Sequence, residues 1–233
     1  MLDSLIVLRK ELIELLGNRH SARGALVQAG VMTVIIGVIV PSLEPRVWSS
    51  AAGIGGPFLF FPAMIAGSVA ADGFAGERER RTLETLLATP LSDGAIFAGK
   101  ALTAVLFATA VAALALAASI VTVNVHRVGG GLFLPPLAHV TAVLGGAVGV
   151  ATLGTAMAIV ISTRVAVARS AQQMVSVLAM IIAGATLAIF GRLGIPFDWV
   201  NLPRIGDSLL VAGVLGLRAG MALFIRDRVF ENR

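Results

Sequence analysis

Charged side chains of both signs crowd into one stretch of an otherwise apolar sequence. Between residues 71 and 92 the chain reads ADGFAGERERRTLETLLATPLS, and its charges fall at Glu77, Arg78, Glu79, Arg80, Arg81 and Glu84. If this stretch is helical, opposite charges four residues apart, such as Glu77 and Arg81, lie one turn apart and attract each other. A membrane protein needs basic residues in a loop to fix its orientation, but acidic residues contribute little to that. The mixture of signs therefore favours a contact with another molecule.

The second half of this stretch is apolar on one side. Leu83, Leu86 and Leu87 share a helical face, and Pro90 ends the helix because proline disfavours helical geometry in the residue before it. We therefore predict a short helix over about residues 74–88. Its leucines would face the membrane or the helix bundle, and its charges would face a soluble partner.

Side chains that carry out covalent or metal chemistry are missing from the sequence. It has no cysteine, and His20, His126 and His139 are too scattered to suggest a metal site. It has no G-x-x-x-x-G-K-[ST] phosphate loop, no H-E-x-x-H and no G-x-S-x-G. We therefore expect no catalysis, no metal and no cofactor in this chain. If ATP drives the protein, ATP and Mg²⁺ must bind a second polypeptide.

The composition is that of a membrane protein. Hydrophobic residues make up 57% of the 233 residues and charged residues 13%, against about 25% charged in soluble domains. The mean hydropathy is +0.93. The net charge of +5 does not indicate nucleic-acid binding, because the basic residues form short clusters between apolar runs and no continuous stripe.

The apolar runs predict an all-α fold with one domain over residues 1–233. Residues 2–16 have leucines at helical spacing with charges between them, which favours an amphipathic helix on the membrane surface. A spanning helix needs about 20 apolar residues. Six stretches qualify, at about residues 25–43, 53–71, 96–123, 137–161, 172–190 and 209–225.

The distribution of basic residues predicts the orientation. With six spans, 14 of the 18 lysines and arginines lie on the side of the two termini. The positive-inside rule then places both termini in the cytoplasm of a multi-pass protein of the cell's inner (cytoplasmic) membrane. Trp48 and Trp199 fall in the opposite loops, where aromatic side chains anchor helices at the lipid interface.

The charged stretch resembles a signature of ABC-2 type permeases, the membrane subunits of a class of ATP-binding-cassette exporters. The pattern G-E-R-E-R-x-T-L-E-x-L-L-x-[TS]-P matches at Gly76, Glu77, Arg78, Glu79, Arg80, Thr82, Leu83, Glu84, Leu86, Leu87, Thr89 and Pro90, with Lys100 at the start of the next span. The resemblance implies a coupling helix that docks on the nucleotide-binding subunit. The residues expected at that contact are Phe74, Glu77, Arg78, Glu79, Arg81, Leu83, Glu84 and Leu87.

The resemblance also implies partners. It implies an ATPase subunit, a second permease copy that is identical or related, and membrane lipids, but no nucleic acid. A second, smaller ATPase contact is expected in the loop STRVAVARSAQQ, where Arg164 and Arg169 are candidates. These two arginines also fit a purely topological role.

Two residues inside predicted spans stand out. Pro62, preceded by Gly55, Gly56 and Pro57, should kink or interrupt the second span. Arg218 is the one charge well inside a span. It either extends to the lipid surface, pairs within the fold or lines the substrate path.

The sequence favours the permease subunit of an exporter for an apolar or amphipathic substrate. Two alternatives remain open at this point. One is a membrane scaffold that docks a cytoplasmic partner without a transport path of its own. The other is an ion-coupled secondary transporter, although such proteins keep ionisable groups at membrane depth and this sequence has few.

Overall fold

The computed structural model describes residues 2–17, 22–48, 50–79, 91–126, 131–165 and 167–231. Within these ranges its regular elements are all helices and no strand occurs. Six helical segments are long and apolar enough to cross a membrane: Gly24–Leu43, Ala51–Gly76, Asp93–His126, Leu137–Ser162, Ala168–Arg192 and Leu202–Ala222. The predicted all-α membrane fold with six spans is therefore confirmed.

The first two spans are built from several short pieces. Helix α1 (Leu2–Leu16) precedes the first span, which is α2 (Ala22–Val34), a π-helical turn η1 (Ile35–Ile39) and α3 (Val40–Leu43). Helix α4 (Pro45–Trp48) leads to the second span, which is α5 (Ala51–Phe58), α6 (Phe61–Ala71) and a second π-helical turn, η2 (Asp72–Gly76). Helix α7 (Glu77–Glu79) continues from η2.

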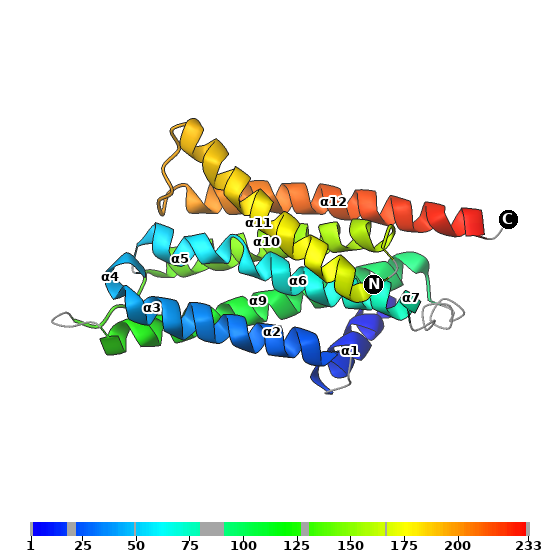
Figure 1. Ribbon diagram of the computed structural model, residues 1–233, viewed down its shortest axis with the longest axis horizontal. Coiled ribbons are helices and arrows are strands. Elements are labelled where there is room, and N and C mark those ends of the chain that lie inside the picture. Colours follow the sequence, from blue (N-terminus) through cyan, green and yellow to red (C-terminus); the bar gives the residue numbers. More distant parts are fainter. Residues whose placement is uncertain are drawn as a thin grey trace.

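The other four spans are single long helices. They are α9 (Asp93–His126), α10 (Leu137–Ser162), α11 (Ala168–Arg192) and α12 (Leu202–Glu231). The helices run roughly side by side, with α1, α7 and the C-terminus at one end of the bundle and α4 at the other (Figure 1). We call these the charged end and the opposite end.

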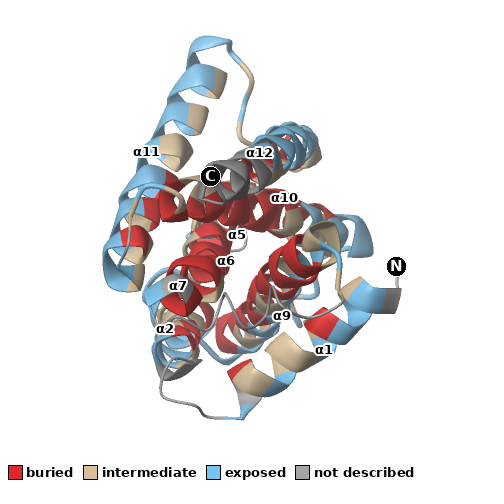
Figure 2. Cartoon of the chain, turned by 90° about the vertical axis from the view of Figure 1, so that its right-hand side faces the viewer, coloured by how far each residue is buried: buried red, intermediate tan, exposed pale blue. Residues whose placement is uncertain are grey.

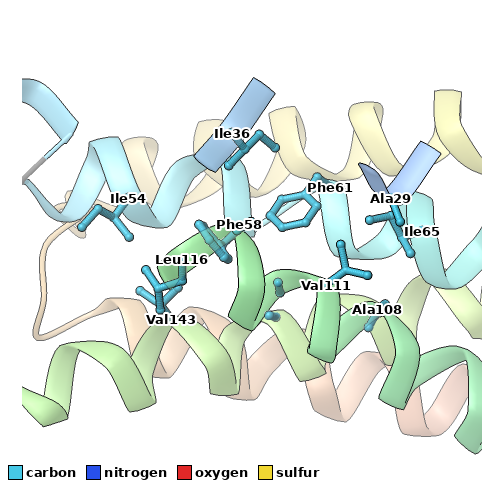
Figure 3. Close-up of a cluster of buried hydrophobic side chains, with 14 of the residues drawn as sticks. Ala29, Ile36, Ile54, Phe58, Phe61, Ile65, Ala108, Val111, Leu116 and Val143 are labelled. Carbon is cyan, nitrogen blue, oxygen red and sulfur yellow. The ribbon is translucent and has the colours of Figure 1, made fainter. Parts of the chain in front are cut away.

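The second span is interrupted as its prolines predict. Helix α5 ends at Phe58, and α6 begins at Phe61 with Pro62 in its first turn. Proline is tolerated there because the first backbone N–H groups of a helix have no partner within it. The Phe58 and Phe61 rings meet edge to face with centroids 5.0 Å apart, so the interruption places both rings in the core (Figure 3).

A neighbouring helix contacts the π-helical turn η1. Such a turn widens the regular hydrogen-bond pattern of the backbone. The Thr122 hydroxyl of α9 donates to the Gly37 carbonyl oxygen at 2.9 Å, so the altered backbone gains a partner from outside its own helix. A Cβ atom on Gly37 would overlap the Cβ of Ala118, and the glycine therefore lets the first span lie directly against α9.

Small residues bring α10 close to both α12 and α6. A Cβ on Gly149 would overlap the backbone oxygen of Gly206 in α12, and a Cβ on Gly154 would overlap the backbone of Ala63 in α6. Small residues at such positions let helix backbones approach closely inside a membrane. Helices α6, α9 and α10 form the buried centre of the bundle, and α12 lies at its edge (Figure 2).

The six spans differ strongly in how far the chain itself covers them. In Ala51–Gly76, 78% of the most apolar stretch is buried, whereas in Ala168–Arg192 only 11% is. Helix α11 is anchored near its start by the buried Val175, and most of its length is exposed (Figure 2). Met180 and Ile181 are among its exposed side chains.

One sequence expectation about side-chain placement is wrong. Trp48 is buried in the core with 3% of its surface exposed, so it does not anchor the chain in lipid. In α1 the partly buried side is the one that carries Lys10 and Glu11, while Ile6 and Ile13 are exposed. Glu11 of this side finds a buried partner in Lys100, whereas Asp3 and Arg9 are exposed.

Candidate functional site

A buried lysine joins three elements at the charged end. Lys100 lies in α9 with 3% of its surface exposed. Its Nζ donates to Oε1 of Glu11 in α1 and to Oε1 of Glu77 in α7, each at 2.7 Å. An ion buried without a partner is strongly destabilising, and breaking such a pair costs about 3–5 kcal/mol. The two carboxylates thus hold Lys100 in place and hold α1 and α7 against α9.

The backbone around Lys100 is shaped for this contact. A Cβ on Gly99 would overlap the side chain of Val7, which is fully buried. The glycine therefore allows α1 to lie against α9 close enough for Glu11 to reach Lys100. Helix α9 is 34 residues long, about 51 Å at 1.5 Å per residue. It exceeds the hydrocarbon thickness of about 30 Å, so part of the helix extends past the membrane core.

A second lysine extends the cluster toward solvent. Lys10 Nζ lies 3.3 Å from Glu11, 3.4 Å from Glu14 and 3.8 Å from Glu77. Burial alone would lower the pKa of Lys10, but the three surrounding carboxylates outweigh burial and raise this pKa above its ordinary value. We call Lys10, Glu11, Glu14, Glu77 and Lys100 the ionic cluster.

Two of the predicted partner contacts lie inside the chain. Phe74 is buried in η2, and its ring lies 5.7 Å from that of Phe97 in α9. Glu77 has 8% of its surface exposed and binds Lys100. Both differ from the expectation that they touch another subunit, because packing and ion pairing within the chain already cover them. Their position suits them to link the charged stretch to α9.

Glu79 joins the charged stretch to the second predicted contact. It is exposed, and its Oε2 accepts a hydrogen bond from the backbone N–H of Ala168 at 3.2 Å. Ala168 is the first residue of α11, and no other side chain caps this helix among the described residues. A carboxylate at a helix N-terminus satisfies a free N–H and interacts favourably with the helix dipole. Glu79 therefore ties α7 to α11.

The two arginines of the second predicted contact lie beside this junction. Arg164 precedes α11 and Arg169 is its second residue, and both are exposed. They remain available to another molecule. The side chains of Arg78, Arg81, Leu83, Glu84 and Leu87 lie outside the described residues, so their contacts remain predictions.

The two residues singled out inside spans have different surroundings. Pro62 is buried at the interruption of the second span, which is a structural position. Arg218 of α12 is exposed on the side of the bundle, where it borders an apolar groove between α9, α10 and α12. None of the described side chains forms a salt bridge with Arg218.

The described part of the chain has no cluster of metal-ligating side chains. No group of three His, Asp or Glu side chains there could hold a metal ion. The ionic cluster pairs each lysine with carboxylates and so suits a mechanical connection between helices.

Sequence reasoning missed Lys100 and Glu11 as site residues. The available signal was the position of Lys100 near the start of an apolar span, because a charge at that depth needs a partner. The identity of the partner could not be inferred, since Glu11 and Lys100 are 89 positions apart in the sequence.

Comparison with known proteins gives one finding on the family. A family model described as "ABC-2 type transporter" matches residues 4–202. The matched region includes the ionic cluster, the charged stretch and the first five spans. No curated protein matches the sequence.

Proposed function

This chain belongs to the ABC-2 type transporter family and is a multi-pass membrane permease. We propose that a separate ATPase subunit drives it through the part of the charged stretch that lies beyond α7. The observation that carries the proposal is the pair of hydrogen bonds that Lys100 donates to Glu11 and Glu77. It fixes the start of the charged stretch to α1 and α9 through bonds of 2.7 Å. A force that reaches Glu77 would therefore be passed to both α9 and α1.

We place the charged end in the cytoplasm, with both termini there, and the protein in the cell's inner membrane. The excess of basic residues near this end supports the orientation. ATP and Mg²⁺ bind the partner subunit in this proposal, and the permease itself performs no catalysis. Arg78, Arg81 and Glu84 supply the charges that dock on the ATPase, with Leu83 and Leu87 turned toward the bundle.

The proposed mechanism moves the charged stretch when the ATPase subunits bind ATP and close. Motion of α7 reaches α9 and α1 through Glu77 and Lys100. It reaches α11 through the hydrogen bond from Ala168 to Glu79. Arg164 and Arg169 make the second, smaller contact beside that bond. The spans then tilt and open the path toward the opposite end.

The pathway forms between two permease copies in this proposal. Six spans are too few to enclose a path, and α11 leaves most of its apolar length uncovered. The α11 face, with the second span behind it, would line the seam between the copies. Its exposed side chains, such as Met180 and Ile181, are apolar. They suit an apolar or amphipathic substrate, which the complex would export.

ATP turnover by the reconstituted complex tests the proposal. The chain would be co-expressed with ATP-binding-cassette ATPases encoded near it, purified and placed in lipid vesicles. Glu79→Ala removes the bond to α11 and should lower permease-stimulated ATP turnover several-fold. Glu44→Ala changes an exposed glutamate at the opposite end and should leave turnover unchanged.

Three outcomes would contradict the proposal. One is that no neighbouring ATPase binds the permease. Another is that Glu79→Ala and Glu44→Ala behave alike. The third is transport that continues with hydrolysis-dead ATPase subunits and follows an ion gradient, which would assign the protein to the ion-coupled class.

A further inference from the structure

An apolar groove runs along the side of the bundle in its charged half. It has a volume of about 520 Å³, within the range of about 300–1,000 Å³ that is usual for small-molecule sites. Helix α10 forms its floor, and α9 and α12 form its walls. Helix α12 contacts α10 closely at Gly149 and Gly206, and it contacts α9 where Met221 lies against Gly94.

The groove wall carries one charge and offers no other free polar group. Phe97, Ala101 and Val105 line it from α9, and Leu217 lines it from α12. Thr152 also lines it, but its hydroxyl donates to the Val148 carbonyl of its own helix at 2.7 Å. Arg218 is therefore the only one of these lining residues with a free side-chain donor for an anionic ligand.

The groove has the length and depth of one lipid leaflet. From Phe97 to Val105 it follows α9 for about 12 Å, and half of the hydrocarbon core is about 15 Å thick. Met221 lies against Gly94, the second residue of α9, which places it near the membrane surface. Arg218 comes three residues before Met221 in α12, about 4.5 Å deeper. Its long side chain can extend back to the level of the lipid headgroups.

Arg218 lacks a counter-charge in the described part of the chain. A cation at this depth is costly unless an anion neutralises it. A guanidinium binds phosphate oxygens through two parallel hydrogen bonds. An amphiphile with one negative charge and an apolar tail therefore matches both the charge and the wall of the groove.

We propose that this groove is a binding site for an anionic phospholipid of the leaflet at the charged end, with its phosphate on Arg218 and one acyl chain between α9 and α12. A membrane helix of another chain fits less well. Such contacts favour small residues, whereas bulky side chains such as Phe97, Leu102 and Leu217 border this groove. The inference requires only that the chain spans a membrane, so it does not depend on a partner ATPase.

Native mass spectrometry of the full chain in mild detergent tests the site. Dioleoyl phosphatidylglycerol is the anionic probe and dioleoyl phosphatidylcholine the zwitterionic one. Both lipids carry a phosphate, but the choline ammonium cancels the net charge of the second, so the unmodified chain should bind the anionic lipid about tenfold more tightly, or about 1.4 kcal/mol. Arg218→Gln should remove this preference. Ala98→Phe fills the groove from an exposed position and should weaken binding of both lipids.

Two matched controls keep the test specific. Arg192→Gln removes an exposed arginine at the far end of α11, and Ala117→Phe enlarges an exposed alanine elsewhere on α9. Both should bind the two lipids as the unmodified chain does. Equal affinity for the two lipids in the unmodified chain, or an unchanged preference in Arg218→Gln, would overturn the proposal. So would conversion of a dimer to a monomer by Ala98→Phe, which would assign the groove to a second chain.

Discussion

The ionic cluster and the α11 face differ in whether the chain completes them by itself. In the cluster, Lys100 is buried and both of its carboxylate partners come from the same chain. Along α11, only 11% of the most apolar stretch is covered. The difference separates residues that hold the fold together from residues that are left for lipid or another subunit. Substitutions in the two regions should therefore fail in different ways.

Removing the buried lysine should have the largest effect on stability. Lys100→Met leaves Glu11 and Glu77 without their buried cation and with only the half-exposed Lys10 nearby, and we expect the free energy of unfolding to fall by about 3–5 kcal/mol. Lys10→Met removes a side chain that is 41% exposed and should cost far less. Unfolding by SDS titration in mixed micelles would measure both. Equal losses in the two variants would show that the cluster does not hold α1 and α7 in place.

Substitutions at the close helix contacts of the buried centre should have the second-largest effect on stability. Gly154→Ala places a methyl group against the backbone of Ala63, and overpacking of this kind costs about 1–3 kcal/mol. Gly145→Ala on the same helix meets no atom within 4 Å, and the helix propensity of alanine favours it. Unfolding of the two variants under identical conditions compares them. A Gly154→Ala variant as stable as Gly145→Ala would mean that α6 and α10 are not in close contact.

Substitutions on the exposed face of α11 should change how the chain assembles and should hardly change its stability. The chain has no cysteine, so Ile181→Cys introduces a single thiol at an exposed position. Stability should change by no more than about 0.5 kcal/mol, while mild oxidation in membranes should yield cross-linked dimers. Leu114→Cys is exposed on α9 and should not cross-link. Cross-linking through Leu114→Cys alone would move the seam to another face.

The smallest effect concerns the pH dependence of stability. The pKa of Lys10 is raised in the folded chain by its carboxylate neighbours. Its contribution is thus fully present below the unfolded pKa of about 10.4 and is lost as pH rises through the folded value. Thermal melting between about pH 9 and 11 should fall less steeply in Lys10→Met. The chain has no tyrosine or cysteine, and Lys10 and Lys100 are its only lysines, so few other groups titrate there. An unchanged slope in Lys10→Met would argue against the raised pKa.

The spans could be predicted from the sequence because the bilayer leaves little choice. A backbone in hydrocarbon must satisfy its own hydrogen bonds, so a long apolar run becomes a helix. The interruption near Pro62 followed from the same local rules. Which faces of the helices meet could not be predicted. The segment Ala168–Arg192 has a mean hydropathy of 2.3 and Ala51–Gly76 one of 1.6, yet the less apolar segment is the buried one.

The candidate site was only partly predictable for the same reason. The charged stretch was visible because its residues are neighbours in the sequence. Its connection to the bundle was not, because Lys100 and Glu11 meet only after α1 packs on α9. The burial of Glu11 of α1 against Lys100 could not be predicted either, because charges on a surface helix normally face solvent.

The central claim is that an ATPase subunit docks on the part of the charged stretch that lies beyond α7. The most direct test is its affinity for the permease in lipid nanodiscs, measured for the unmodified chain and for a variant with Arg78→Ala, Arg81→Ala and Glu84→Ala. A control variant carries Arg192→Ala and Arg204→Ala, which lie away from this stretch. We predict that the triple variant binds at least about tenfold more weakly, as expected for the loss of charged contacts, while the control binds normally. Unchanged affinity in the triple variant would contradict the claim.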